Sequence, residues 1–140
     1  IRYGSIYGEG ASRKNGITKI IFNALKTGKL QYSGTKNAIR RFIHAKDAAR
    51  LTVNTLSKRY SNCSMMITGD KEIKIKDLML YLQKKLDIKK KLLYSNKIEL
   101  GHYDKNPFSY EEIKNKVIKF KAKKNFENNL DKLIKYLQNE

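Results

Sequence analysis

The chain has 140 residues, which is the size of one domain. Its apolar runs stay well short of the roughly 18 residues that a membrane-spanning helix needs, and no signal-peptide pattern is present, so we do not expect a membrane partner. The single cysteine, Cys63, excludes an intrachain disulfide and is typical of a reducing compartment. We therefore expect a soluble, cytoplasmic protein.

The 31 Lys and Arg residues outnumber the 13 Asp and Glu residues, which gives a net charge of +18. A charge of this size attracts polyanions of any kind. However, most cationic residues are lysines, and these are spread from Lys14 to Lys135 instead of being interleaved with aromatic residues on one face. We interpret them as a solvated coat and do not expect nucleic acid as the partner. A basic nucleic-acid-binding domain stays open as an alternative.

The first quarter of the chain has the pattern strand, helix, strand. Residues 1–7 predict a strand, and a loop then leads to Asn15 and Gly16. Apolar residues repeat at helical spacing from Ile17, and Gly28 ends the predicted helix. Residues 30–33 predict a second, short strand.

The middle of the chain continues this alternation. Residues 39–45 predict another strand, and Asp47 is expected to cap the helix that follows. The apolar run 64–68 is typical of a strand buried on both faces in a parallel sheet. The buried stripe of the intervening helix is expected to contain Ala49, Val53, Leu56 and Tyr60.

In the last part, a short extended piece at residues 72–75 precedes a predicted helix with Leu78, Met79, Leu82 and Leu86. Residues 91–94 predict one more strand, 110–119 a weak helix, and 126–137 a well-patterned final helix. Alternating strands and helices indicate an α/β fold, but the strands are too few for a complete doubly wound sheet. The chain begins inside a predicted strand and without Met, so we expect residues 1–140 to form a single partial domain of a longer protein.

Arg40 is the residue that points most directly to a ligand. It opens a predicted strand in which Phe42 and His44 share its face. A guanidinium held on a strand suits a diphosphate, because its planar fork donates two hydrogen bonds to phosphate oxygens. Taken alone, the residue would favour an ordinary surface arginine.

The segment around Arg40 is similar to a motif of a known family. Residues 40–47, Arg-Arg-Phe-Ile-His-Ala-Lys-Asp, resemble the Arg-Asp-(Phe/Tyr)-Ile-His-Val-x-Asp motif of nucleotide-sugar epimerases and dehydratases, which are extended short-chain dehydrogenases/reductases. The resemblance implies that Arg40 contacts the nucleotide diphosphate and that His44 has a structural role. Arg41 stands where many members carry Asp, and Ala45 where they carry Val.

The start of the chain is similar to the same family. Residues 2–10, Arg-Tyr-Gly-Ser-Ile-Tyr-Gly-Glu-Gly, resemble its Arg-x-x-(Asn/Ser)-x-Tyr-Gly-Pro segment at the end of a sheet strand, where ligands of open α/β sheets bind. The resemblance implies that Tyr3 lies against the nicotinamide of the cofactor and that Ser5 lies near the sugar or its phosphate. Glu9 replaces the usual Pro and is expected to loosen the loop.

Two further segments fit the same resemblance. Asn15 begins a helix whose N-terminal amides help to hold an anion, and family members place an Asn near the diphosphate. Residues 31–33 resemble the short strand that holds the nucleotide base, and Tyr32 is expected to stack on it. The resemblance therefore implies substrate binding by Ser5, Asn15, Tyr32 and Arg40.

The resemblance implies the C-terminal, substrate-binding portion of a Rossmann-like enzyme, with a few sheet strands and a small mixed α/β lobe. The full enzyme would be an NAD(P)-dependent nucleotide-sugar epimerase, dehydratase or reductase, and a homodimer. NAD or NADP would be bound mainly by the missing N-terminal half, since this chain has no Gly-x-x-Gly-x-x-Gly loop.

We expect no catalytic residue in this portion, because the family's Tyr-x-x-x-Lys pair precedes the segment that resembles residues 2–10. Tyr81 and Lys85 have that spacing but lie too far along the chain, and we interpret the match as accidental. A non-catalytic nucleotide-binding module is a second alternative. On its own the portion is expected to leave sheet edges open.

Overall fold

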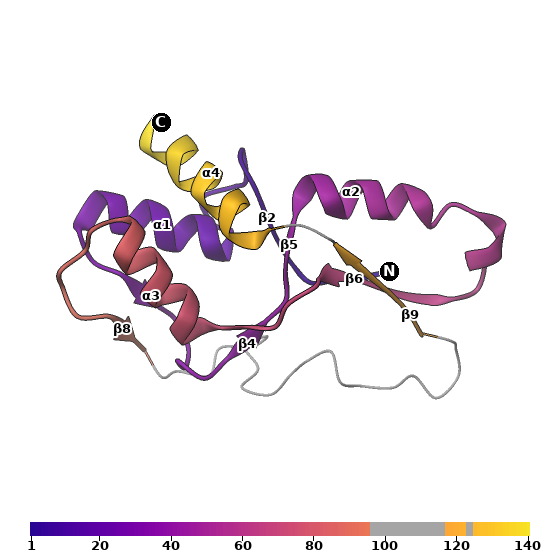
Figure 1. Cartoon of the computed structure of the whole chain (residues 1–140), viewed down its shortest axis with the longest axis horizontal. Helices are drawn as coiled ribbons and strands as arrows, with labels where there is room; N and C mark the ends of the chain where they lie inside the picture. Colours follow the sequence, from indigo (N-terminus) through magenta and orange to yellow (C-terminus); the bar gives the residue numbers. More distant parts are fainter. Residues whose placement is uncertain (96–116, 123–124) are drawn as a thin grey trace.

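The computed structural model describes residues 1–95, 117–122 and 125–140. Three helices group at one end of the molecule, and a fourth lies at the other end over two strands (Figure 1). The grouped helices are α1 (Gly16–Thr27), α3 (Ile75–Lys85) and α4 (Phe126–Gln138), and the separate helix is α2 (Ala45–Asn54). In the part of the chain that is described, no helix is long and apolar enough to cross a membrane.

The strands pair mainly in parallel. The largest sheet has the order β1-β6-β9, with both pairings parallel, and β2 pairs in parallel with β5. These strands are β1 (Arg2–Tyr3), β2 (Ser5–Tyr7), β5 (Phe42–His44), β6 (Ser64–Gly69) and β9 (Val117–Ala122). Parallel strands alternating with helices confirm the predicted α/β class.

Two shorter pairs complete the described strands. They consist of β3 (Gln31–Tyr32) with β8 (Leu93–Tyr94), which are parallel, and β4 (Ile39–Arg40) with β7 (Ile73–Lys74), which are antiparallel. A single 3₁₀ turn, η1 (Lys58–Tyr60), follows α2. The short pairs frame the group of three helices and carry Tyr32 and Arg40.

The opening strand changes its partner at Gly4. The Gly4 N–H donates to the Ile67 carbonyl at 2.9 Å, and the Ser5 N–H donates to the Arg41 carbonyl at 2.8 Å. Sequence analysis predicted one strand over residues 1–7, whereas the chain pairs with β6 before Gly4 and with β5 after it. A Cβ atom on Gly4 would lie 2.3 Å from the Arg41 carbonyl oxygen, so only glycine permits this approach.

The buried apolar residues form two clusters. The larger lies between α1, α3 and α4, where the helical patterns read from the sequence are confirmed; its fully buried members include Ile21, Leu78, Met79, Leu82 and Leu133. The smaller lies beneath α2 and consists of Ile43, Ala48, Leu51 and Ile67. The first cluster shapes the cavities described below.

The predicted start and buried face of α2 are wrong. The helix begins at Ala45, and its N-cap is His44, whose Nδ1 accepts from the Lys46 N–H at 3.3 Å. Asp47 lies in the first turn. Because β5 runs directly into the helix, the face that packs on β6 consists of Ala48 and Leu51. Of the predicted stripe, Ala49 and Val53 are exposed on α2, whereas exposed Leu56 and half-buried Tyr60 lie beyond the end of the helix at Asn54.

The weak helix predicted over residues 110–119 is wrong at residues 117–119, which belong to β9; residues 110–116 lie outside the described ranges. β9 pairs with β6 from Val117 to Ala122, along the whole length of both strands. A neighbouring strand that offers six residues of ladder outweighs a weak local helix propensity. Pairing with β6 therefore determines the strand conformation of residues 117–122.

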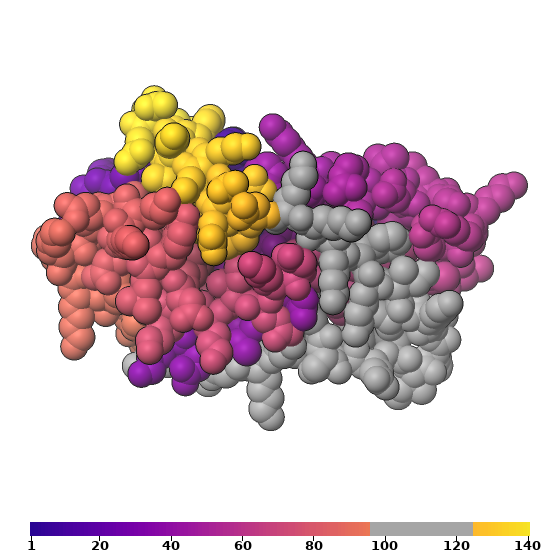
Figure 2. All heavy atoms as spheres, viewed as in Figure 1, coloured from indigo at the N-terminus to yellow at the C-terminus, as the bar shows by residue number. Residues whose placement is uncertain are grey.

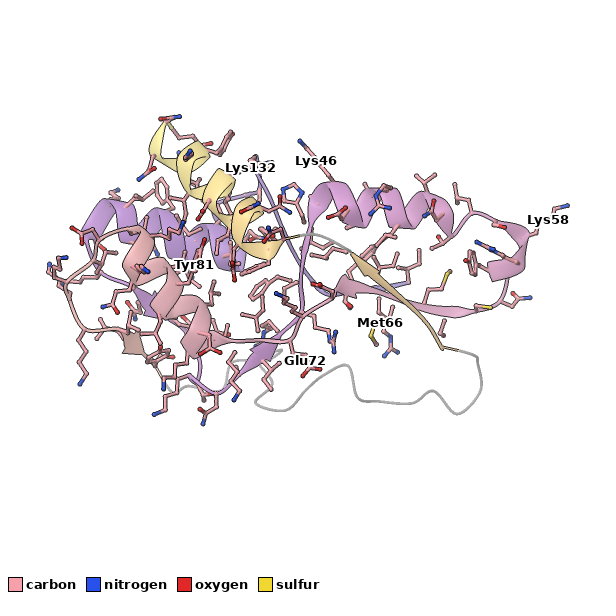
Figure 3. All side chains as sticks on the ribbon, in the orientation of Figure 1. Lys46, Lys58, Met66, Glu72, Tyr81 and Lys132 are labelled. Carbon is pink, nitrogen blue, oxygen red and sulfur yellow. The ribbon has the colours of Figure 1, made fainter. Side chains whose placement is uncertain are left out.

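A polar cluster fastens α3 to α4, and Figure 3 labels its member Tyr81 on α3. The Tyr81 hydroxyl donates to Asp131 Oδ1 at 2.7 Å, and the Lys85 ammonium donates to Asp131 Oδ2 at 2.7 Å. Burial raises the pKa of Tyr81, and the Asp131 carboxylate raises it further. A proton-transfer tyrosine needs a lowered pKa, and the pKa of Tyr81 is shifted in the opposite direction.

We predict that Gly69→Ala lowers the free energy of unfolding by about 1–3 kcal/mol. The new Cβ would lie 2.0 Å from the Phe42 carbonyl oxygen, and backbone must move to relieve the clash. Urea unfolding of the protein measures the change. Gly16→Ala is the matched control, since nothing lies within 4 Å of its Cβ position; equal stability of the two variants would contradict the close approach.

We predict that wild type exceeds Asp131→Asn in stability by up to about 1 kcal/mol near neutral pH, and that the difference vanishes in acid. Hydrogen bonds from Lys85 and Tyr81 outweigh burial and lower the pKa of Asp131. The stabilisation is complete above the ordinary aspartate pKa of about 3.9 and is lost as the pH falls through the lower folded value. Unfolding curves between pH 7 and pH 2 test this, and a pH-independent difference would contradict it.

Candidate functional site

A cavity of about 320 Å³ opens between β2, the start of α1, β4 and α3. Its polar lining consists of Ser5, Asn15, Tyr32 and Arg40, which are the four residues that sequence analysis assigned to substrate binding. The apolar lining is supplied by Ile6, Ile17, Ile20, Phe42, Ile75 and Leu78. Four positions separated by up to 35 residues in sequence thus meet at one site.

Two hydrogen bonds within the protein hold the Arg40 guanidinium in place. Its Nη1 donates to the Ile39 carbonyl at 2.8 Å, and its Nη2 donates to the Tyr32 hydroxyl at 3.4 Å. The side chain is half-buried in the cavity wall. A guanidinium held in this way has lost much of its conformational freedom before a ligand arrives, which lowers the cost of binding an anion.

Asn15 ties the start of α1 to β2, because its Nδ2 donates to the Ile6 carbonyl at 2.9 Å. The Asn15 side chain makes no capping hydrogen bond to the α1 backbone. Gly16 and Ile17, the first residues of α1, line the same cavity. The positive end of the helix dipole therefore lies on the side of the cavity that Asn15 anchors.

A second cavity of about 340 Å³ adjoins the first, since Gly16, Ile20 and Tyr32 line both. It contains the segment that was predicted to hold a nucleotide base, residues 31–33. Its other lining residues, Lys14, Lys19 and Asn23, were missed by sequence analysis. The spacing of Lys19 and Asn23, four residues apart on one helix face, was the available signal, but lysines are too frequent in this chain for it to stand out.

The charged residues that line the two cavities are all cationic: Lys14, Lys19 and Arg40. Arg41, next to Arg40, points elsewhere and forms an ion pair with Glu72 at 2.7 Å and a hydrogen bond with the Asp70 carbonyl at 3.2 Å. Arg41 lines neither cavity. The lining therefore suits an anionic ligand of extended shape.

Tyr3, the predicted cofactor contact, lies apart from both cavities. It stands on β1, and its ring is 40% exposed. Its hydroxyl shares a hydrogen bond of 2.7 Å with the Thr52 hydroxyl of α2. The structure thus brings together the four predicted substrate residues and places the fifth predicted residue at the sheet edge.

The loop after β2 is fastened by Glu9. Because His44 Nδ1 accepts from the Lys46 N–H, its Nε2 carries the proton and donates to Glu9 Oε2 at 2.9 Å. Hydrogen bonding to its own backbone N–H and to His44 lowers the pKa of Glu9. The expectation that Glu9 loosens this loop is wrong, whereas the structural role expected for buried His44 agrees with its helix cap and its hydrogen bond to Glu9.

No protein-family model matches the chain, and no curated protein matches it. Solved structures match it closely. A UDP-glucose 4-epimerase from Thermotoga maritima with UDP-glucose has a TM-score of 0.76 at 15% identity, over 99% of this chain and 45% of its own. A dTDP-glucose 4,6-dehydratase from Bacillus anthracis in complex with NAD has a TM-score of 0.75 at 17% identity, over 99% of this chain and 44% of its own.

A UDP-glucuronic acid 4-epimerase from Bacillus cereus, in complex with a fluorinated UDP-sugar and NAD, has a TM-score of 0.70 at 16% identity, over 99% of this chain and 44% of its own. The chain thus spans less than half the length of the solved enzymes that it matches. The fold implied by the sequence resemblance is confirmed: the chain has the fold of one portion of the nucleotide-sugar epimerases and dehydratases.

Proposed function

We propose that this chain is the substrate-binding portion of an NAD(P)-dependent nucleotide-sugar epimerase, dehydratase or reductase. The observation that carries the proposal is the meeting of Ser5, Asn15, Tyr32 and Arg40 around one cavity. The sequence motifs predict these four positions, and an unrelated fold would have no reason to bring them together.

The charge and shape of the cavities support a nucleoside diphosphate as the group that is bound. In this arrangement Arg40 and the first turn of α1 hold the two phosphates, because a guanidinium fork and a helix N-terminus both match phosphate oxygens. The base enters the second cavity against Tyr32, beside Gln31 and Ser33. Ser5 lies at the first cavity, where the sugar would continue from the phosphates.

The cofactor of such an enzyme accepts and returns a hydride at its nicotinamide. The residues described here fit only a small part of that cofactor: Tyr3 offers one exposed aromatic ring at the sheet edge, and the chain has no glycine-rich phosphate loop. We therefore propose that NAD or NADP is bound mainly by another portion of the enzyme. Three of the matched structures are described as complexes with NAD and a nucleotide sugar or with NAD alone.

The chemical step is likewise proposed to lie outside this chain. Among the described residues, Tyr81 and Lys85 are engaged by Asp131 between α3 and α4 and do not line either cavity. The role of this portion is then to hold the nucleotide sugar in a fixed position beside the cofactor. A homodimeric full-length enzyme belongs to the same proposal.

We predict that Arg40→Gln weakens UDP binding by about 10- to 100-fold while leaving uridine binding nearly unchanged, because only UDP carries the diphosphate that the guanidinium contacts. Isothermal titration calorimetry with UDP, and with dTDP and GDP in case another base binds tighter, provides the affinities. Arg50→Gln is the matched control, since Arg50 is an exposed arginine paired with Asp47 on α2.

The proposal would be wrong if Arg40→Gln and wild type bound every nucleoside diphosphate equally. A chain that prefers duplex or single-stranded DNA to all of these ligands, with an affinity that falls steeply as salt is raised, would favour the nucleic-acid alternative instead.

We also predict that the double substitution Lys14→Gln and Lys19→Gln weakens UDP binding by about three- to tenfold. Both lysines line the second cavity, and neither forms an ion pair within the described ranges. Lys26→Gln with Lys29→Gln removes the same charge from the far end of α1 and serves as the control. Equal losses in the two double variants would show that the effect is one of net charge alone.

A further inference from the structure

The polar side chains that line the second cavity are of two chemical kinds. Asn23, Gln31 and Ser33 carry an amide or a hydroxyl group, which can donate or accept a hydrogen bond. Lys14 and Lys19 carry an ammonium group, which only donates. An amide can turn over to suit either kind of partner, whereas an ammonium group cannot. The lysines therefore determine which ligand atoms this cavity prefers.

Lys19 and Asn23 lie on the same face of α1. They are four residues apart, so their side chains are neighbours on the helix surface. The buried face of α1, which includes Ile17, Ile21 and Ala24, belongs to the core shared with α3 and α4, and these two helices hide most of α1 in Figure 2. Lys19 and Asn23 are exposed and line the cavity instead. Neither side chain forms a hydrogen bond or an ion pair within the described ranges.

The other side of the cavity is formed by β3 and the residue after it. Gln31, Tyr32 and Ser33 lie on this side, and Tyr32 and Ile20 supply the apolar side chains of the lining. An aromatic ring and an isoleucine suit the flat faces of a planar base. The polar groups on the two sides are then left for the edge of the base, where its carbonyl, amino and ring nitrogen groups lie.

We propose that Lys19 selects a base with a carbonyl oxygen at its edge, so that the substrates are sugars linked to uridine, thymidine or guanosine diphosphate. This inference rests on the proposed function. Uracil, thymine and guanine carry a carbonyl oxygen at the position where cytosine and adenine carry an amino group. The ammonium group donates to that oxygen. It cannot pair with an amino group, because two donors that face each other leave both without an acceptor.

The general charge of the chain does not produce this preference. UDP and CDP carry the same charge near neutral pH, and so do GDP and ADP, so a net charge of +18 attracts both members of each pair equally. The ratio of the two dissociation constants within a pair removes this common attraction and reports on the edge of the base alone.

The test measures the dissociation constants of UDP, CDP, GDP and ADP by isothermal titration calorimetry at neutral pH. Wild type is compared with Lys19→Met, which removes the ammonium group and keeps an unbranched side chain. Lys26→Met is the matched control, since Lys26 is an exposed lysine of the same helix that lines neither cavity. Circular dichroism checks that both variants are folded.

We expect wild type to bind UDP about fivefold or more tighter than CDP, and GDP tighter than ADP by a similar factor. Lys19→Met is expected to bring both ratios to about two or less, and Lys26→Met to leave them unchanged. Equal affinities within each pair for wild type would overturn the inference. So would ratios that survive in Lys19→Met, or that fall equally in Lys26→Met.

The same titrations separate this inference from the proposed function. Ratios near one, combined with UDP binding that Arg40→Gln weakens, would overturn the selection by Lys19 and leave the diphosphate site supported. Absence of binding for all four nucleoside diphosphates would overturn both.

Discussion

The architecture depends on one backbone crossing, at which two glycines allow β5 to approach both β2 and the end of β6. Gly4 faces the Arg41 carbonyl, and Gly69 faces the Phe42 carbonyl, at distances that no side chain could accommodate. The opening strand can therefore leave β6 and pair with β5 within a single residue. This switch places Ser5 opposite Phe42 and brings Arg40, two residues earlier, to the wall of the cavity.

The cavity that results is preorganised by contacts made within the protein. Arg40 is held by the Ile39 carbonyl and the Tyr32 hydroxyl, and Asn15 is held by the Ile6 carbonyl. These hydrogen bonds orient the two groups, and the charged lining residues are Arg40 in the first cavity and Lys14 and Lys19 in the second. Under the proposed function, such a site would discriminate by charge and by the distance between the phosphates and the base, as a substrate-positioning portion requires.

Sequence reasoning located the cavity residues because each belongs to a short local motif next to a strand or helix end. Arg40 and Ser5 stand on strands whose pattern was correct even though their exact limits were not. Lys14 and Lys19 were missed because nothing in a lysine-rich chain marks two lysines as special. The start of α2 was missed because Asp47 is a preferred cap residue and His44 is not, whereas the junction with β5 places the cap at His44. β9 forms because its residues pair with β6, and a pairing between segments far apart in the chain leaves no pattern in the local sequence.

The proposed function requires that a nucleoside diphosphate binds in the Arg40 cavity. The most direct measurement is a ¹H–¹⁵N NMR titration of the protein with UDP. We predict saturable shifts at the amides of Ser5, Gly16 and Ile17, at the Asn15 side chain and at the Arg40 guanidinium, with Lys58 and the remainder of η1 unaffected. Saturable binding that leaves these groups unchanged and shifts another surface, or no binding of UDP, dTDP or GDP at millimolar concentration, would contradict it.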